Sequence, residues 1–168
     1  MSLPPDLSAI EIRYATESDI PELAHLRWEF HQSTDSDETK QEFIARYTSW
    51  FESSFNSKRW RFVIATAPNH SICGSAFLQI IDKVPSPGIT NSAWGYITNS
   101  YVRSSHRGNG IGGFILQQII ETAKALELEL LLVWPSVEAV PFYQRHGFKD
   151  VEKAHWHPED YPPMELVF

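Results

Sequence analysis

The chain has 168 residues, of which 42% are hydrophobic and 21% are charged, and this composition predicts one soluble globular domain over residues 1–168. Fourteen lysines and arginines against 21 acidic residues give a formal net charge of −7, which disfavours partners such as nucleic acid or an anionic membrane. The single cysteine excludes an internal disulfide framework. The sequence also has no apolar run of membrane-spanning length and no secretory signal at its N-terminus. Together with the single cysteine, these features predict a cytoplasmic protein.

The first third of the chain predicts one strand followed by two helices. The alternating segment IEIRY (10–14) is typical of a strand. TESD (16–19) resembles a capping box, and apolar residues then recur at helical spacing over 20–30. A second helix is expected from about Glu38 to Phe55, because five aromatic residues keep helical spacing there.

The middle of the chain predicts three strands. WRFVIAT (60–66) and ICGSAFLQII (72–81) are rich in β-forming residues, and the short polar segment between them indicates a hairpin. A proline- and glycine-containing loop over 83–92 leads to a further strand over 93–102.

The last third predicts two helices and three strands. A glycine-rich stretch, HRGNGIGGF (106–114), leads into a helix that reaches about Leu126. The nearly continuous apolar run over 128–134 is typical of a strand covered on both faces. A short helix over 138–148 ends at Gly147, and the tail adds two strands. The order β-α-α-β-β-β-α-β-α-β-β predicts a mixed sheet with helices packed on it.

Glycines at a strand-to-helix turn allow the backbone to approach an anion, and free N–H groups at a helix start favour phosphate. A mononucleotide P-loop requires a lysine after the last glycine, but Phe114 follows Gly113. A dinucleotide fingerprint fits Gly108, Gly110 and Gly113, but no carboxylate stands about 20 residues later, near Val133. The third phosphate-bearing ligand that a glycine-rich turn can bind is coenzyme A, through its pyrophosphate.

The third possibility is supported by a family resemblance that extends over nearly the whole chain. RGNGIG (107–112) resembles the R/Q-x-x-G-x-G/A motif of the GNAT N-acetyltransferase superfamily. SVEAVPFYQRHGF (136–148) resembles a second motif of that family, through Ala139, Tyr143, Gly147 and Phe148. The opening segment IRYATESDIPELAHLR is similar to the first strand and helix of the family.

Two residues depart from the family pattern. Ser136 stands where the family often has asparagine, and Pro141 lies inside the predicted helix. Because proline removes a hydrogen bond from a helix interior, this helix is either irregular or starts later, with Pro141 near its first turn.

The resemblance implies a fold and an activity. The fold would be α/β, a GNAT-like mixed sheet of about seven strands splayed between the fourth and fifth and flanked by about four helices. The activity would be N-acetyl transfer from acetyl-CoA, as co-substrate and without a metal, to a primary amine that attacks the thioester directly. The acceptor would be a small-molecule amine or a peptide or protein amine, and the resemblance permits a homodimer.

It also implies roles for particular residues. Backbone N–H groups over 107–112 would bind the pyrophosphate, with added charge from the Arg107 side chain. The end of the fourth strand would bind the pantetheine arm through its backbone. Tyr143 would lie near the sulfur and protonate the departing thiolate. The implied cofactor-binding residues are Tyr101, Val102, Arg103, Arg107, Gly108, Asn109, Gly110, Ile111, Gly112 and Tyr143.

Several points stay open at the level of sequence. The general base could be His106, Glu138, His155, Glu165 or a water chain, and Arg145 could reach the 3′-phosphate of the cofactor. Aromatic residues could border an acceptor pocket and suit an apolar or aromatic amine. The alternative function is a non-catalytic acyl-CoA-binding or sensor module on the same fold.

Overall fold

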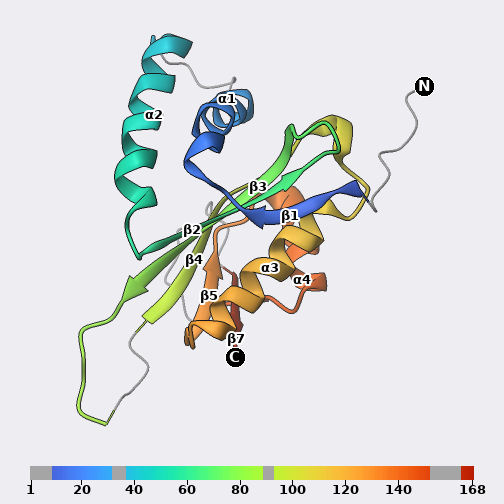
Figure 1. The fold of residues 1–168 in the computed structure, drawn as a ribbon. Helices are drawn as coiled ribbons and strands as arrows, with labels where there is room; N and C mark the ends of the chain where they lie inside the picture. The colour runs from blue at the N-terminus through green and yellow to red at the C-terminus, as the bar shows by residue number, and fades with distance from the viewer. Residues whose placement is uncertain (1–8, 32–36, 89–92, 152–163) are drawn as a thin grey trace.

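Figure 1 shows the computed structural model of the chain, which describes residues 9–31, 37–88, 93–151 and 164–168. In these ranges, seven strands form one sheet in the order β1-β2-β3-β4-β5-β7-β6. Neighbouring strands are antiparallel, except that β4 and β5 are parallel. The strands are β1 (Glu11–Tyr14), β2 (Trp60–Thr66), β3 (Ile72–Asp82), β4 (Ala93–Val102), β5 (Leu130–Val133), β6 (Lys149–Asp150) and β7 (Met164–Val167).

Within the described residues, four α-helices cover the two faces of the sheet. They are α1 (Ile20–Phe30), α2 (Lys40–Phe55), α3 (Ile111–Ala125) and α4 (Val140–Arg145). Helices α1 and α2 lie on one face and α3 and α4 on the other (Figure 1). The predicted class, a mixed α/β sheet of about seven strands with about four helices, is confirmed.

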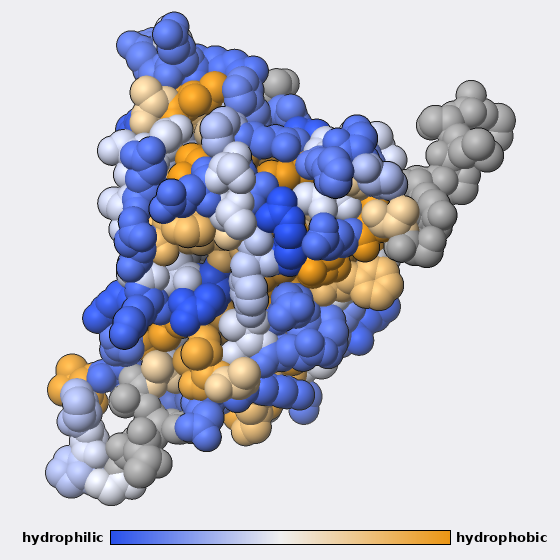
Figure 2. Space-filling model, viewed as in Figure 1, coloured by the Kyte–Doolittle hydropathy of each residue, from blue (hydrophilic) through white to orange (hydrophobic). Residues whose placement is uncertain are grey.

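The pleat of the strands separates two hydrophobic cores. Along β2, Phe62 and Ile64 join the core under α1 and α2, whereas Val63 and Ala65 join the core under α3. This alternation is the two-residue period of a strand buried on both faces. On the face shown in Figure 2, apolar side chains are small patches among mostly hydrophilic ones, because these two cores hold most of the large apolar residues.

Two helix boundaries differ from those predicted. Helix α2 begins at Lys40 rather than near Glu38, because the Thr39 side chain accepts a hydrogen bond from the Glu42 backbone N–H and closes a capping box. The helix predicted over 138–148 is shorter: a 3-10 turn precedes α4, and Pro141 lies in its first turn. The later start is therefore correct, and proline stands where its missing N–H costs no helical hydrogen bond.

The predicted splay between the fourth and fifth strands is confirmed by the register. Strand β4 pairs with β5 only from Gly95 to Ile97, and β5 ends at Val133, opposite Ile97. Strand β4 continues to Val102 with no partner on that side among the described residues. Asn99, with φ of 53°, marks a bulge on the side facing β3, where the register shifts. The sheet is therefore open beside the second half of β4.

The start of α1 is fixed by an ion pair with strand β1. Two nitrogens of the Arg13 guanidinium donate to the two carboxylate oxygens of Asp19 at 2.8 Å. The backbone N–H and hydroxyl of Thr16 donate to the same carboxylate at 2.6 and 2.8 Å. The Arg13 hydrogen bond, followed by those from Thr16, lowers the pKa of Asp19 to about 2 against the opposing effect of burial. The direction of α1 thus depends on one ionised carboxylate.

We predict that Asp19→Asn lowers the free energy of unfolding at pH 7 by about 2 kcal/mol, from the difference between a folded pKa of about 2 and the usual value of 3.8. Because the folded pKa is depressed, this stability is present above pH 4 and disappears as the pH falls from about 4 to 2. Urea unfolding across this range should show the two proteins converge at low pH. Glu17→Gln, in the same turn, is the control, and an equal loss there would contradict the account.

Candidate active site

The glycine-rich loop is shaped by two residues in the left-handed region of backbone space. Gly108 and Gly110 both have φ of 77°, and Gly110 is the N-cap of α3. Residues with a Cβ rarely adopt this conformation. A Cβ on Gly108 would meet no atom within 4 Å, so the glycine is required by the backbone angle rather than by lack of space.

This loop presents a set of unused backbone donors. Within the described residues, no hydrogen bond engages the backbone N–H of Gly108, Asn109, Gly110, Ile111 or Gly112. The first turn of a helix leaves its N–H groups without intrahelical partners, and the helix dipole adds partial positive charge. Five consecutive donors at the start of α3 are a chemically suitable set for a pyrophosphate.

Arg107 is anchored beside this cradle. Its Nε donates to the backbone oxygen of Val102 at 2.8 Å, and its guanidinium carbon lies 5.4 Å from the centre of the Tyr101 ring. These contacts employ Nε and one face of the guanidinium, so the two terminal nitrogens remain donors for an anion. The predicted contribution of Arg107 to an anion site thus has a structural basis.

The end of β4 directs one backbone N–H into the opening. The Arg103 N–H donates to the Cys73 oxygen on β3 at 2.9 Å. Since backbone groups alternate in direction along a strand, the N–H of Val102 points to the opposite side, where β5 has ended. The Tyr101 ring packs against Phe30 of α1, with ring centres 5.0 Å apart. Of the three residues predicted to hold a pantetheine arm, Val102 is the one whose backbone N–H faces the opening.

The Arg103 side chain turns away from the glycine loop toward α1. Its guanidinium lies 3.7 Å from the Glu22 carboxylate and 3.4 Å from that of Glu29. These contacts link the end of β4 to α1, and a structural role for this side chain follows from them.

Tyr143 of α4 lies under the opening, on the α3 side of the sheet. Its side chain is buried, and its hydroxyl donates to the Ser100 Oγ at 3.1 Å. Burial raises the pKa of this phenol above its usual value, against a smaller opposing effect of the Ser100 hydrogen bond. Tyr143 is therefore a protonated donor at neutral pH, held toward an exposed position on β4.

A cavity of about 780 Å³ follows the opening. Five of the residues predicted for cofactor binding line it: Tyr101, Val102, Arg107, Gly112 and Tyr143. Gly108, Asn109, Gly110 and Ile111 lie on the adjoining loop and helix start, and Arg103 follows Val102 at the strand end. We call this space the donor cavity.

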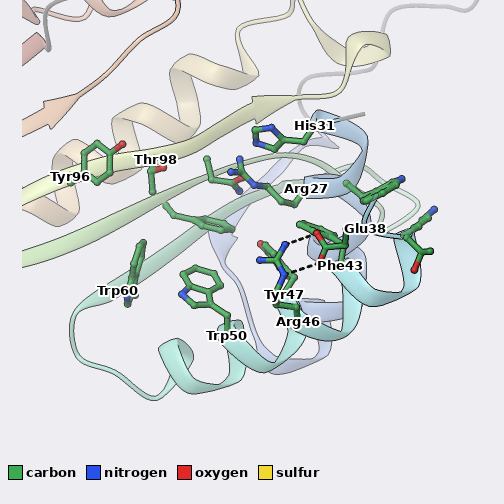
Figure 3. Close-up of a pocket in the computed structure, with 15 residues that line it drawn as sticks. Arg27, His31, Glu38, Phe43, Arg46, Tyr47, Trp50, Trp60, Tyr96 and Thr98 are labelled. Atoms are coloured by element: carbon green, nitrogen blue, oxygen red, sulfur yellow. Dashed lines mark hydrogen bonds and ion pairs between the residues drawn. The ribbon is translucent and has the colours of Figure 1, made fainter. Parts of the chain in front are cut away.

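A second cavity, of about 800 Å³, lies between α1, α2 and the sheet (Figure 3). We call it the aromatic cavity, because its walls include Trp28, Phe43, Tyr47, Trp50, Trp60, Phe77 and Tyr96. Five residues line both cavities: Arg27, His31, Tyr96, Thr98 and Asn99. The two spaces therefore meet at the bulge of β4.

Sequence reasoning did not single out Arg27 and His31, although both stand where the cavities meet. They are four residues apart, so they lie on one side of a helical turn, and Figure 3 shows both side chains at the cavity. The sequence shows this spacing, but only the structure shows that α1 places both residues where the two cavities meet.

The other candidates from the sequence are more widely distributed. Glu138 lines the donor cavity, and hydrogen bonds from its own backbone N–H and from Ser136 lower its pKa. The His106 Nδ1 and the Ser105 hydroxyl form a hydrogen bond of 2.9 Å. Neither cavity is lined by His106, Arg145 or Glu165. His155 lies outside the described residues.

The described residues also include no group of three or more His, Cys, Asp or Glu side chains placed to hold a metal ion. In the same residues, no helix is long and apolar enough to cross a membrane.

Comparison with known proteins identifies the family of this chain. The family model described as "Acetyltransferase (GNAT) family" matches residues 20–148. The chain belongs to the GNAT acetyltransferase family. This confirms the family inferred from the sequence motifs and places the chain among acyl-CoA-dependent acetyltransferases.

Individual relatives agree with this assignment. The chain is 30% identical, over 91 residues, to a glucosamine 6-phosphate N-acetyltransferase of Trypanosoma brucei brucei, and the match spans 54% of this chain and 60% of that protein. A predicted acetyltransferase from Clostridium acetobutylicum, solved with acetyl-CoA, has a TM-score of 0.71 at 23% identity, covering 88% of this chain and 95% of that one. An acetyltransferase from Trypanosoma brucei gives 0.67 at 23% identity, covering 88% and 98%. The structural likeness concerns the fold.

The glycine cradle predicts a selective effect on cofactor binding. Gly108→Ala forces a Cβ into a left-handed conformation, which costs roughly 1–2 kcal/mol, and displaces N–H donors from the anion. We expect the Kd for coenzyme A, measured by calorimetry, to rise at least tenfold. Gly88→Ala is the matched control, because Gly88 has φ of 79° in an equally open position outside the site. An equal rise in Kd for both variants would contradict a role for the cradle.

Proposed function

We propose that the protein is an N-acetyltransferase that moves an acetyl group from acetyl-CoA to a primary amine by direct attack. The observation that carries this proposal is the meeting of the donor and aromatic cavities at the open bulge of β4. A donor thioester and an acceptor amine entering from the two cavities would meet there, and positioning two reactants supplies much of the rate enhancement in such a transfer. The aromatic cavity is the acceptor side in this scheme.

The residues around the bulge can each take one part of the transfer. The N–H groups over 108–112 and the Arg107 side chain would hold the pyrophosphate. The Val102 N–H would donate to the thioester oxygen as it gains negative charge. The thioester itself supplies an activated acyl group. The amine nitrogen forms the new bond to the acyl carbon, and the carbon–sulfur bond breaks.

Two protons must move in this reaction. The departing sulfur takes one from the Tyr143 hydroxyl, which burial keeps protonated. The amine gives up one, and His31 and Glu138 are the titratable candidates among the described lining residues of the donor cavity. Burial, and then the charge of Arg27, lower the pKa of His31, which therefore stays neutral at pH 7 and able to accept a proton.

The placement of Cys73 supports direct transfer over a covalent acyl-enzyme. Its side chain is fully buried in the core under α3, and its Sγ donates to the Ala65 oxygen at 3.3 Å. Burial raises the pKa of the thiol, so the nucleophilic thiolate is disfavoured. Cys73 is also the only cysteine of the chain, so no other thiol could carry an acyl group.

The acceptor is an amine, as in the curated relative whose name gives glucosamine 6-phosphate as its substrate. That match covers 60% of the relative's length, so it supports acetyl transfer to an amine rather than this particular sugar. Coenzyme A release with an amine panel is the direct test of the proposed function. Binding of acetyl-CoA with no turnover on any amine would favour the non-catalytic module.

The role of Tyr143 predicts a loss in kcat without a comparable loss in cofactor binding. Tyr143→Phe keeps the buried ring and removes the proton, so we expect kcat to fall about 100-fold while the Kd for coenzyme A changes less than threefold. Tyr14→Phe is the matched control. The Tyr14 hydroxyl forms a 2.7 Å hydrogen bond with the Thr122 hydroxyl, and Tyr14 lines neither cavity. If Tyr143→Phe retained full kcat, its proposed role as an acid would be wrong.

Direct transfer predicts that the thiol is dispensable. Cys73→Ala should retain kcat within about threefold, although loss of buried volume lowers the free energy of unfolding by about 1 kcal/mol. Acetyl-CoA turnover and mass spectrometry of the protein during turnover provide the two readouts. An acetylated Cys73 peptide in the wild type, together with loss of turnover in the variant, would overturn direct attack.

A further inference from the structure

The aromatic cavity combines an apolar wall with a basic side. In Figure 3, the rings of Trp50 and Trp60 lie at one end, the Arg46–Glu38 ion pair lies at the other, and Arg27 and His31 lie along the side. The two tryptophan rings meet edge to face with centres 5.4 Å apart. Such walls favour a ligand with an apolar or planar body.

The two arginines of this cavity differ in their pairing. Arg46 is neutralised by two hydrogen bonds to the Glu38 carboxylate, at 2.9 and 2.7 Å. Arg27 donates to the neutral Asn99 Oδ1 at 2.9 Å and lies over the Phe30 ring, and it has no ion pair with a carboxylate among the described residues. Burial lowers its pKa, but a guanidinium remains charged at neutral pH. The chain has an excess of acidic residues, with a net charge of −7, yet none of those described forms an ion pair with this half-buried cation.

A second donor in the aromatic cavity has no hydrogen-bond acceptor among the described residues. The Tyr47 hydroxyl is buried in the wall of the same cavity and has no hydrogen-bond partner among the described residues. Arg27 and Tyr47 both line this cavity, and burial raises the pKa of the Tyr47 phenol strongly, against a smaller lowering by the charge of Arg27. A buried hydroxyl without an acceptor costs free energy unless a ligand supplies one. A guanidinium and a phenol hydroxyl that line one cavity can both donate to a carboxylate bound there.

Neighbouring residues of β4 connect Arg27 with Tyr143. Asn99, which binds Arg27, is followed directly by Ser100, which accepts from Tyr143. The two residues present these partners on opposite faces of the sheet, from α1 and from α4. An acceptor whose anionic group binds Arg27 therefore places its amine at the bulge only if a few bonds separate the amine from the anionic group.

We propose that the acceptor is a free α-amino acid with an aromatic or large apolar side chain, its carboxylate bound by Arg27 and the Tyr47 hydroxyl. The side chain lies in the aromatic cavity, and the α-amine faces the donor cavity. This inference rests on the proposed N-acetyltransferase function. Polyamines and other polycationic acceptors are disfavoured, because they would bring a second positive charge toward Arg27.

The test compares wild-type enzyme on L-tryptophan and on tryptamine, which differs only in lacking the carboxylate, with both amines assayed at one pH. We expect kcat/KM to be roughly 10- to 100-fold higher for L-tryptophan, the range of a hydrogen bond to a charged group. Glucosamine 6-phosphate and spermidine extend the panel to a phosphate-bearing amine and a polyamine. A higher kcat/KM for tryptamine, glucosamine 6-phosphate or spermidine than for L-tryptophan would overturn the proposal.

Variants then assign the preference to its residues. Arg27→Gln should reduce the L-tryptophan to tryptamine ratio of kcat/KM at least tenfold, and Tyr47→Phe, which keeps the buried ring, should reduce it about threefold. Arg46→Gln, in the same cavity but already paired with Glu38, should leave the ratio unchanged. A ratio that stays at its wild-type value in both Arg27→Gln and Tyr47→Phe would overturn the assignment.

The amine panel separates failure of the proposed acceptor class from failure of the proposed acetyltransferase function. Turnover on other amines but not on α-amino acids would refute the acceptor class and leave the acetyltransferase function standing. Absence of turnover on every amine, with acetyl-CoA bound, would refute both.

Discussion

The site depends on the point where strands β4 and β5 stop pairing. Their last pair is Ile97 with Val133, after which β4 continues to Val102 paired only with β3 among the described residues. This leaves the Val102 N–H and the bulge at Asn99 beside an opening in the middle of the sheet. A strand segment that is paired on one edge only leaves the backbone groups of its other edge without partners. Here that free edge borders the donor cavity.

Both faces of the sheet contribute to this opening, and each contributes a different chemistry. The face under α3 and α4 supplies the glycine cradle, Arg107 and Tyr143, which suit an anionic donor and a leaving thiolate. The face under α1 and α2 supplies Arg27, His31 and the aromatic wall, which suit an acceptor. The ion pair of Arg13 with Asp19 fixes the start of α1, so it also positions the residues at the far end of that helix.

Sequence patterns predicted the fold well because its strongest signals are local. Strand alternation, the capping residues at Thr16 and the glycines of the α3 turn each act over a few residues, and the GNAT-like motifs of residues 107–112 and 136–148 indicated the family. Thr39 and Glu42 also have the spacing of a capping box, but the start of α2 at Lys40 and the start of α4 at Val140 were established by the structure. Arg27 and Tyr47 could not be predicted as site residues, because they line one cavity only when α1 and α2 pack over β4. Whether an arginine is neutralised, as Arg46 is, depends on three-dimensional neighbours.

The most direct measurement of the central claim is a thermal-shift comparison with acetyl-CoA, coenzyme A, NAD⁺ and ATP. A ligand that binds only the folded state raises the apparent stability by mass action, so this assay needs no acceptor. We predict that Tm rises with acetyl-CoA and coenzyme A and not with NAD⁺ or ATP. A rise with NAD⁺ alone, or no rise with either acetyl-CoA or coenzyme A, would contradict the assignment of the glycine loop to the coenzyme A pyrophosphate.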